Sequence, residues 1–184
     1  MDETKFWSLI NEATMASMGR DDEKQELLDE LQDLLEELPP EEIVGFQRIM
    51  RDLYWKAYTY NLSGAIFVIL KERCDEDDFH GFRGWLISQG QQFFEQVVAD
   101  PDSMAGDEQM IDDLYLPDIL TLAEDAYVNA TGDDMPIDYD FVEPEDLSGE
   151  PLELADLPQR LPNLCSEYFF VLQPDEEEAP AENT

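Results

Sequence analysis

The stretch that decides the fold class covers residues 21–38 and reads DDEKQELLDELQDLLEEL. Its six leucines follow the i, i+1, i+4, i+7, i+8, i+11 spacing of one helix face: Leu27, Leu28, Leu31, Leu34, Leu35 and Leu38. The opposite face is almost entirely Asp, Glu and Gln, and the first three acids lie where the helix dipole favours negative charge. The stretch therefore predicts an amphipathic helix that packs through a leucine stripe.

Apolar residues at helical spacing recur on both sides of this stretch. They predict a first helix that ends at Gly19, a third that starts at Pro39-Pro40, and others over about 76–89, 91–99 and 107–130, the last interrupted at Pro117. Residues 65–70 fit a buried helix or a buried strand, and their helical neighbours favour a helix. We therefore expect an all-α fold, a compact array of six or seven helices over residues 1–131.

The remainder of the chain has a different composition. Residues 101–184 carry 24 acids and one base, Arg160, and eight of the 11 prolines lie from Pro117 onward. No hydrophobic period continues beyond residue 132, although apolar anchors occur in 137–142 and 168–172. We expect residues 132–172 to form an irregular acidic segment packed on the helical domain, and residues 173–184 to form a disordered acidic tail.

Charge excludes some classes of partner. The chain has 46 acids and 10 bases, a formal net charge of −36, so it repels nucleic acid and anionic membranes.

The sequence also predicts where the protein is found. Its most apolar run has nine residues, whereas a membrane helix needs about 20. The first residues lack the pattern of a secretory leader. Two cysteines 91 residues apart fit no zinc motif. We expect a soluble cytoplasmic protein with two free buried thiols and no cofactor.

Several stretches resemble a known bacterial family. They are MDETKFWSLI (1–10), LPPEEIVGF (38–46), CDEDDFHGFRGWLISQG (74–90) and ADPDS (99–103), together with Ala57-Tyr58 and Ala126-Tyr127. These residues are similar to those of the uncharacterised domain of unknown function 4240 family, over about residues 1–131. The resemblance implies a mostly helical bacterial domain. The family provides no activity to carry over, and the acidic segment after Gly132 is not covered.

An acidic cluster precedes one expected helix and is a candidate metal site. Asp75, Asp77 and Asp78, close to His80, could ligate a divalent cation. The spacing fails the EF-hand pattern, because His80 and Leu86 occupy the positions of its Gly and Glu. The alternative is a capped helix start with an acidic first turn, and this alternative is favoured.

A second candidate site combines the chain's one histidine with aromatic residues. Arg83 lies among apolar residues, where it could pair with a carboxylate of another helix or bind an anion in a cleft. Aromatic residues close to Arg48, Arg51 and Lys56 could either line a binding groove or pack into the core. The ligand-binding candidates are Arg83, Trp85, His80, Tyr58 and Trp55. We find no nucleophile elbow and no phosphate-binding loop.

Two functional hypotheses follow from these observations. The leading one is a non-enzymatic interaction module that binds a basic protein through its acidic surface, for example as an immunity or antitoxin protein or as a mimic of nucleic acid. The alternative is a small enzyme or ligand-binding domain with a pocket around Arg83, Trp85 and His80. A deep cleft that joins Arg83 and His80 with a carboxylate would favour the second hypothesis, and a solid core with Arg83 sealed into a salt bridge would favour the first.

Overall fold

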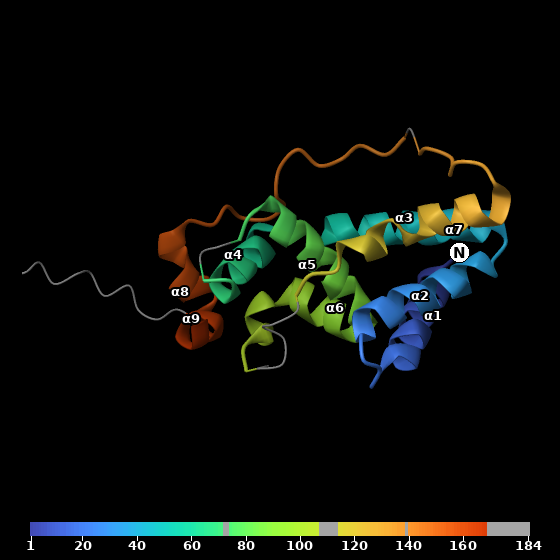
Figure 1. The fold of residues 1–184 in the computed structure, drawn as a ribbon. Coiled ribbons are helices and arrows are strands. Elements are labelled where there is room, and N and C mark those ends of the chain that lie inside the picture. The colour runs from blue at the N-terminus through green and yellow to red at the C-terminus, as the bar shows by residue number, and fades with distance from the viewer. Residues whose placement is uncertain (72–73, 107–113, 139, 169–184) are drawn as a thin grey trace, which may run out of the picture.

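The computed structural model describes residues 1–71, 74–106, 114–138 and 140–168 (Figure 1). The described residues among the first 131 form seven α-helices: α1 (Glu3–Ser17), α2 (Glu23–Glu36), α3 (Pro40–Lys56), α4 (Tyr60–Ile69), α5 (Glu76–Ser88), α6 (Gln91–Ala99) and α7 (Leu122–Thr131). Short 3-10 helices cover Pro101–Met104, Pro117–Leu120 and Leu154–Asp156, and the described part ends with α8 (Leu157–Arg160) and α9 (Pro162–Tyr168). The all-α prediction is confirmed, because no described residue belongs to a β-strand.

Side-chain caps explain where four of the described helices begin, namely α1, α2, α4 and α5. The Asp2 carboxylate accepts the backbone N–H of Lys5 at 2.8 Å, and the hydroxyl of Thr59 accepts that of Leu62 at 3.1 Å. Asp22 and Asp75 cap α2 and α5 in the same way. Each cap satisfies a backbone donor that has no partner inside the helix, so the acids that dominate this sequence also set its helix boundaries.

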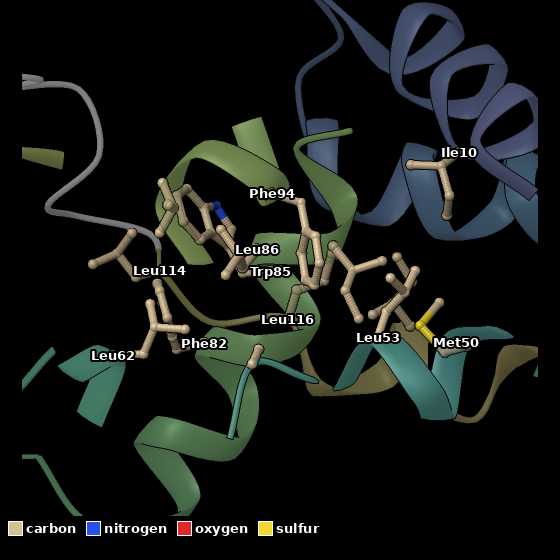
Figure 2. Packing of buried hydrophobic residues seen from close by; sticks show 14 of the residues in the cluster. Ile10, Met50, Leu53, Leu62, Phe82, Trp85, Leu86, Phe94, Leu114 and Leu116 are labelled. Carbon is tan, nitrogen blue, oxygen red and sulfur yellow. The ribbon is translucent and has the colours of Figure 1, made fainter. Parts of the chain in front are cut away.

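The core forms where the apolar stripes of the helices meet. The stripe of α2 is buried at Leu27, Leu28, Leu31 and Leu35, and α2 packs between α1 and α7 (Figure 1). Helix α5 is different, because every residue from Gly81 to Ser88 is buried. It packs against α1, α3, α4 and α6, and Figure 2 shows its Phe82, Trp85 and Leu86 among core residues of these neighbours. Helix α5 therefore forms the centre of the molecule.

Two glycines let the chain cross closely over α5. The N–H of Leu116 donates to the carbonyl of Gly81 at 3.0 Å, and a methyl group at Gly84 would lie 2.3 Å from the carbonyl oxygen of Leu116. The spacing Gly81-x-x-Gly84 places both glycines on the same face of the helix.

The chain returns across the helices after α7. We call residues 133–148 the strap; residue 139 within it is not described. Its far end is fixed where Ser148 forms an isolated parallel bridge to Thr59, with Ser148 N–H donating to the Tyr58 carbonyl at 2.9 Å. Beyond it, the Arg160 guanidinium donates to the carbonyls of Glu150 and Pro151. The strap thus follows the α3 side of the helical body.

The strap is also anchored near its middle. The Arg51 guanidinium donates to the Asp138 carboxylate at 2.9 Å and lies 3.9 Å from the centre of the Phe141 ring. Arg48 also approaches Asp138, at 3.6 Å. The hydrogen bond from Arg51 is the main reason that the pKa of Asp138 lies below its usual value. These contacts tie the strap to α3.

A buried carboxylate attaches the last helix to the body. Asp102 is 7% exposed and accepts the backbone N–H groups of Asn163 and Leu164, the latter at 2.9 Å. It also accepts the Asn163 side-chain amide at 2.7 Å. A helix N-terminus is a favourable place for a carboxylate, because its first N–H groups lack partners.

Several sequence predictions can be compared with these elements. The described residues of 1–131 form seven α-helices, within the predicted six or seven, and residues 65–69 belong to α4 rather than to a strand, with Leu70 as its C-cap. The helix predicted over 107–130 with an interruption at Pro117 is confirmed after that proline, in Pro117–Leu120 and α7, but is wrong at residues 114–116, which have no regular secondary structure. Residues 107–113 and the predicted tail at 173–184 lie outside the described residues. In the segment predicted to be irregular, residues 132–172, α8 and α9 are short helices.

None of the described helices combines the length and apolar character that crossing a bilayer requires.

Candidate functional site

Four aromatic rings surround the guanidinium group of Arg83. Arg83 lies on α5 and is 3% exposed. Its Cζ atom lies 3.7 Å from the centre of the Tyr54 ring, 4.7 Å from Tyr58, 4.8 Å from Phe79 and 5.6 Å from Trp55. Three of these rings come from the end of α3 and the residues after it, and Phe79 lies one turn earlier on α5. We call these five residues the Arg83 cage.

The hydrogen bonding of Arg83 is incomplete. Its Nε–H donates to the Phe79 carbonyl at 3.3 Å, whereas the buried Nη1 has no hydrogen-bond partner among the described residues. The predicted pairing with an acid of another helix is not found among the described residues, where no carboxylate forms an ion pair with Arg83. Aromatic faces attract cations, and they take the place of that acid here. Burial holds the pKa of Arg83 below its usual value.

His80 and Tyr54 form a hydrogen-bonded pair at the edge of the cage. The Tyr54 hydroxyl and the His80 Nδ1 atom are 2.7 Å apart. Burial is the main cause that lowers the pKa of His80, and the nearby Arg83 charge lowers it further. Burial also raises the pKa of Tyr54, although the Arg83 charge opposes this. Both side chains are therefore uncharged at neutral pH, and the Tyr54 O–H can donate to Nδ1 when the ring proton is on Nε2.

The lowered pKa of His80 predicts a pH dependence. Because the unfolded chain takes up a proton near pH 6.5 and the folded chain resists it, the contribution of His80 to stability is present above that pH. This contribution is lost as the pH falls below 6.5 toward the folded pKa. We expect His80→Gln to lose less stability than the wild type between neutral pH and pH 5, measured by urea denaturation.

The pKa of His80 offers a direct test of the role of the Arg83 charge. We expect Arg83→Met to raise the pKa of His80 toward its usual value, because one of the two causes that lower it is removed. The chain has a single histidine, so one NMR titration of its ring protons measures this value without ambiguity. An unchanged pKa would show that burial alone perturbs His80.

The structure brings together four of the five predicted ligand-binding residues. Arg83, Tyr58 and Trp55 belong to the cage, and His80 lies at its edge. Trp85 is separate, because it packs against Phe82 and Phe93 in the core (Figure 2). The ligand-binding candidates did not include Tyr54 and Phe79, which lie four residues before Tyr58 and Arg83. That i, i+4 spacing on a helix is the signal that could have identified them.

The predicted metal-binding acids have other partners. The Asp75 carboxylate accepts the backbone N–H of Asp78 at 2.9 Å, and the Asp78 carboxylate accepts that of Asp75 at 3.1 Å. This reciprocal arrangement is a capping box that starts α5, whereas Asp77 is exposed in the first turn. In the described ranges, no three His, Cys, Asp or Glu side chains are placed to hold a metal ion.

Neither cysteine is placed to act as a nucleophile. Both are free, as predicted, with Cys165 buried and Cys74 half-buried. Burial, followed by the charges of Asp78 and Asp75, raises the pKa of the Cys74 thiol to about 11. Burial also raises the pKa of Cys165. Because the thiolate is the reactive form, both side chains are poor nucleophiles at neutral pH.

Comparison with known proteins places the helical body in a family. A family model described as a protein of unknown function (DUF4240) matches residues 1–129. The chain belongs to this family. No curated protein and no solved structure matches the chain. The DUF4240 match contains the complete Arg83 cage and ends at the last turn of α7, so the strap lies beyond it.

Proposed function

We propose that this DUF4240 protein is a non-enzymatic interaction module that binds a basic protein partner in the cytoplasm. The observation that carries the proposal is the charge: with 46 acids and 10 bases, at least 36 carboxylates have no base of their own within the chain. A surface of this kind attracts a basic partner and repels acidic ones. An immunity or antitoxin protein, or a mimic of nucleic acid, would be a member of this class.

The exposed face of α2 illustrates how little of this charge is neutralised. Its exposed acids are Glu23, Asp29, Asp33, Glu36 and Glu37. Two of them accept hydrogen bonds from amide side chains, Asp29 from Gln25 and Glu36 from Gln32 and Asn129. Such bonds lower the pKa of Glu36 but leave its negative charge in place. The face is therefore available to positive groups of another molecule.

The alternative, a small enzyme or ligand-binding pocket, has weaker support. The unpartnered Nη1 of Arg83 favours an anionic ligand, since a buried donor without a partner is costly. However, Arg83 is 3% exposed, and aromatic rings already occupy the faces of its guanidinium group. Trp85, which the pocket would need, lies elsewhere in the core.

A salt-dependent capture experiment tests the proposed function. The full chain is immobilised and exposed to a lysate, and bound proteins are compared after washes at about 0.1 M and about 1 M salt, where the Debye length falls from about 10 Å to about 3 Å. We expect one basic protein to be retained at low salt and released at high salt. The control bait is an unrelated folded protein of equal net charge, which should not retain it.

Two outcomes of this experiment would contradict the proposed function. Capture of the same basic proteins by both baits would show that the charge alone acts, without specific recognition. A partner retained equally at both salt concentrations would remove the electrostatic basis of the proposal.

A further inference from the structure

A groove lies between the strap, α3 and α7. Its volume is about 680 Å³, within the range of about 300–1,000 Å³ that is typical of ligand sites. Its walls come from one face of α3 between residues 44 and 51, from α7 residues 124, 125 and 128, and from strap residues 134–138, 141 and 143. Figure 1 shows how the strap leaves α7 and arches along this side of the molecule.

The groove presents apolar side chains to solvent. Val128 is 41% exposed and Ile137 is 71% exposed, and both line the groove. Val44, Met135 and Phe141 add further apolar surface to its walls. Exposed apolar side chains that gather in a concave surface, surrounded by polar residues, are typical of interaction sites. This feature favours an occupant that carries at least one apolar side chain.

The charges around the groove are also unbalanced. Five acids and two arginines line it. Both arginines, Arg48 and Arg51, contact the same carboxylate, Asp138. The other four acids have no ion-pair partner within the described ranges, and they are Glu124, Asp125, Asp134 and Glu143. Because these acids occupy both the α7 wall and the strap, a positive group inside the groove would lie between them.

We propose that this groove binds a short basic segment of a partner protein. Lysine or arginine side chains of that segment meet the four unpaired carboxylates, and an apolar side chain covers Val128 and Ile137. The inference rests on the proposed function and assigns its docking site. Charge complementarity selects this occupant: a nucleic acid or a phosphate would be repelled, and a second copy of the chain carries the same net charge of −36.

Two short labelled peptides provide the probe. One is rich in lysine and carries leucines, and in the other serines replace the leucines at the same charge. Their affinities for the full chain are measured by fluorescence anisotropy at about 0.1 M salt, where electrostatic attraction still extends about 10 Å. We expect the wild type to bind the leucine-containing peptide more tightly than the serine-containing one.

Two matched sets of substitutions locate the site. The groove set is Glu124→Gln, Asp125→Asn, Asp134→Asn and Glu143→Gln. The control set removes the same charge at exposed acids elsewhere, through Glu3→Gln, Glu12→Gln, Asp21→Asn and Asp118→Asn. We expect the groove set to weaken binding of the leucine-containing peptide at least tenfold and the control set less than threefold. Ile137→Ser should abolish the preference for leucine over serine.

The results separate this inference from the proposed function. Equal losses in the two sets would overturn the groove while leaving general binding of basic proteins intact. Failure of the wild type to bind either peptide would overturn both. Thermal melting verifies that each variant folds. In the wild type, peptide-induced shifts of the Val44 and Val128 methyl signals, without shifts of Val97 and Val98 on α6, locate the same site without substitution; the reverse pattern would overturn it.

Discussion

Arg83→Ala is expected to lower the free energy of unfolding by about 3 kcal/mol, the range typical of large-to-small changes in a core. The side chain fills the space among four aromatic rings, and its guanidinium group lies 3.7 Å from the centre of the Tyr54 ring. Alanine removes both this packing and the cation–π attraction, which can reach about 2 kcal/mol at a desolvated site. Removing the unpartnered Nη1 offsets part of the loss. Urea denaturation measures the difference.

Arg83→Met separates the volume of the side chain from its charge. Methionine fills much of the same space without a buried charge, and replacement of buried ionic groups by apolar ones is often close to neutral. We expect a loss below about 1.5 kcal/mol. A loss as large as that of alanine would contradict this expectation and would show that the guanidinium group itself holds the rings together.

Gly84→Ala is expected to destabilise the protein by about 2 kcal/mol, within the usual cost of overpacking. The new methyl group would lie 2.3 Å from the Leu116 carbonyl oxygen and 3.1 Å from Cγ2 of Ile119. A backbone atom cannot rotate away, so the crossing segment must move. This cost exceeds the gain of about 1 kcal/mol that alanine brings to a helix. At about 2–4 °C per kcal/mol, the melting temperature should fall by roughly 4–8 °C.

Gly81→Ala is the matched control on the same helix face. Its methyl group would meet the ring of Tyr115 at 2.1 Å, but this side chain is 48% exposed and can swing into solvent. We expect a change within about 1 kcal/mol, because the gain in helix propensity offsets the displacement of the ring. If Gly84→Ala melted at or above the wild-type temperature, the close crossing at Leu116 would be contradicted.

The helical body could be predicted because its signals are local. The leucine stripe of α2 and the caps at Asp22 and Asp75 lie within a few residues of the elements that they define. The helix predicted over residues 107–130 is wrong just before Pro117, where the chain crosses α5. That path depends on two glycines more than 30 residues earlier, and no local pattern encodes it.

The Arg83 cage was predicted only in part, since the candidates included Arg83, Tyr58 and Trp55 but neither Tyr54 nor Phe79. Apolar neighbours on α5 indicated that Arg83 is buried, and burial suggested an ion pair. The pairing of Tyr54 and Tyr58 with Arg83 depends on how α3 and α5 pack, which sequence spacing does not determine. Similarly, one wall of the groove is held where two arginines of α3 contact Asp138, about 90 positions away in the chain.

The single base in the second half of the chain has a practical consequence for peptide mapping. Arg160 holds the end of the strap region through backbone carbonyls. No lysine or arginine lies between Arg83 and Arg160, so complete trypsin digestion leaves residues 84–160, a fragment of 77 residues that contains the whole strap. Trypsin therefore cannot detect whether the strap opens. A protease that cuts after glutamate has a site at Glu145 within the strap, and its cleavage rate there would report directly on the opening of that segment.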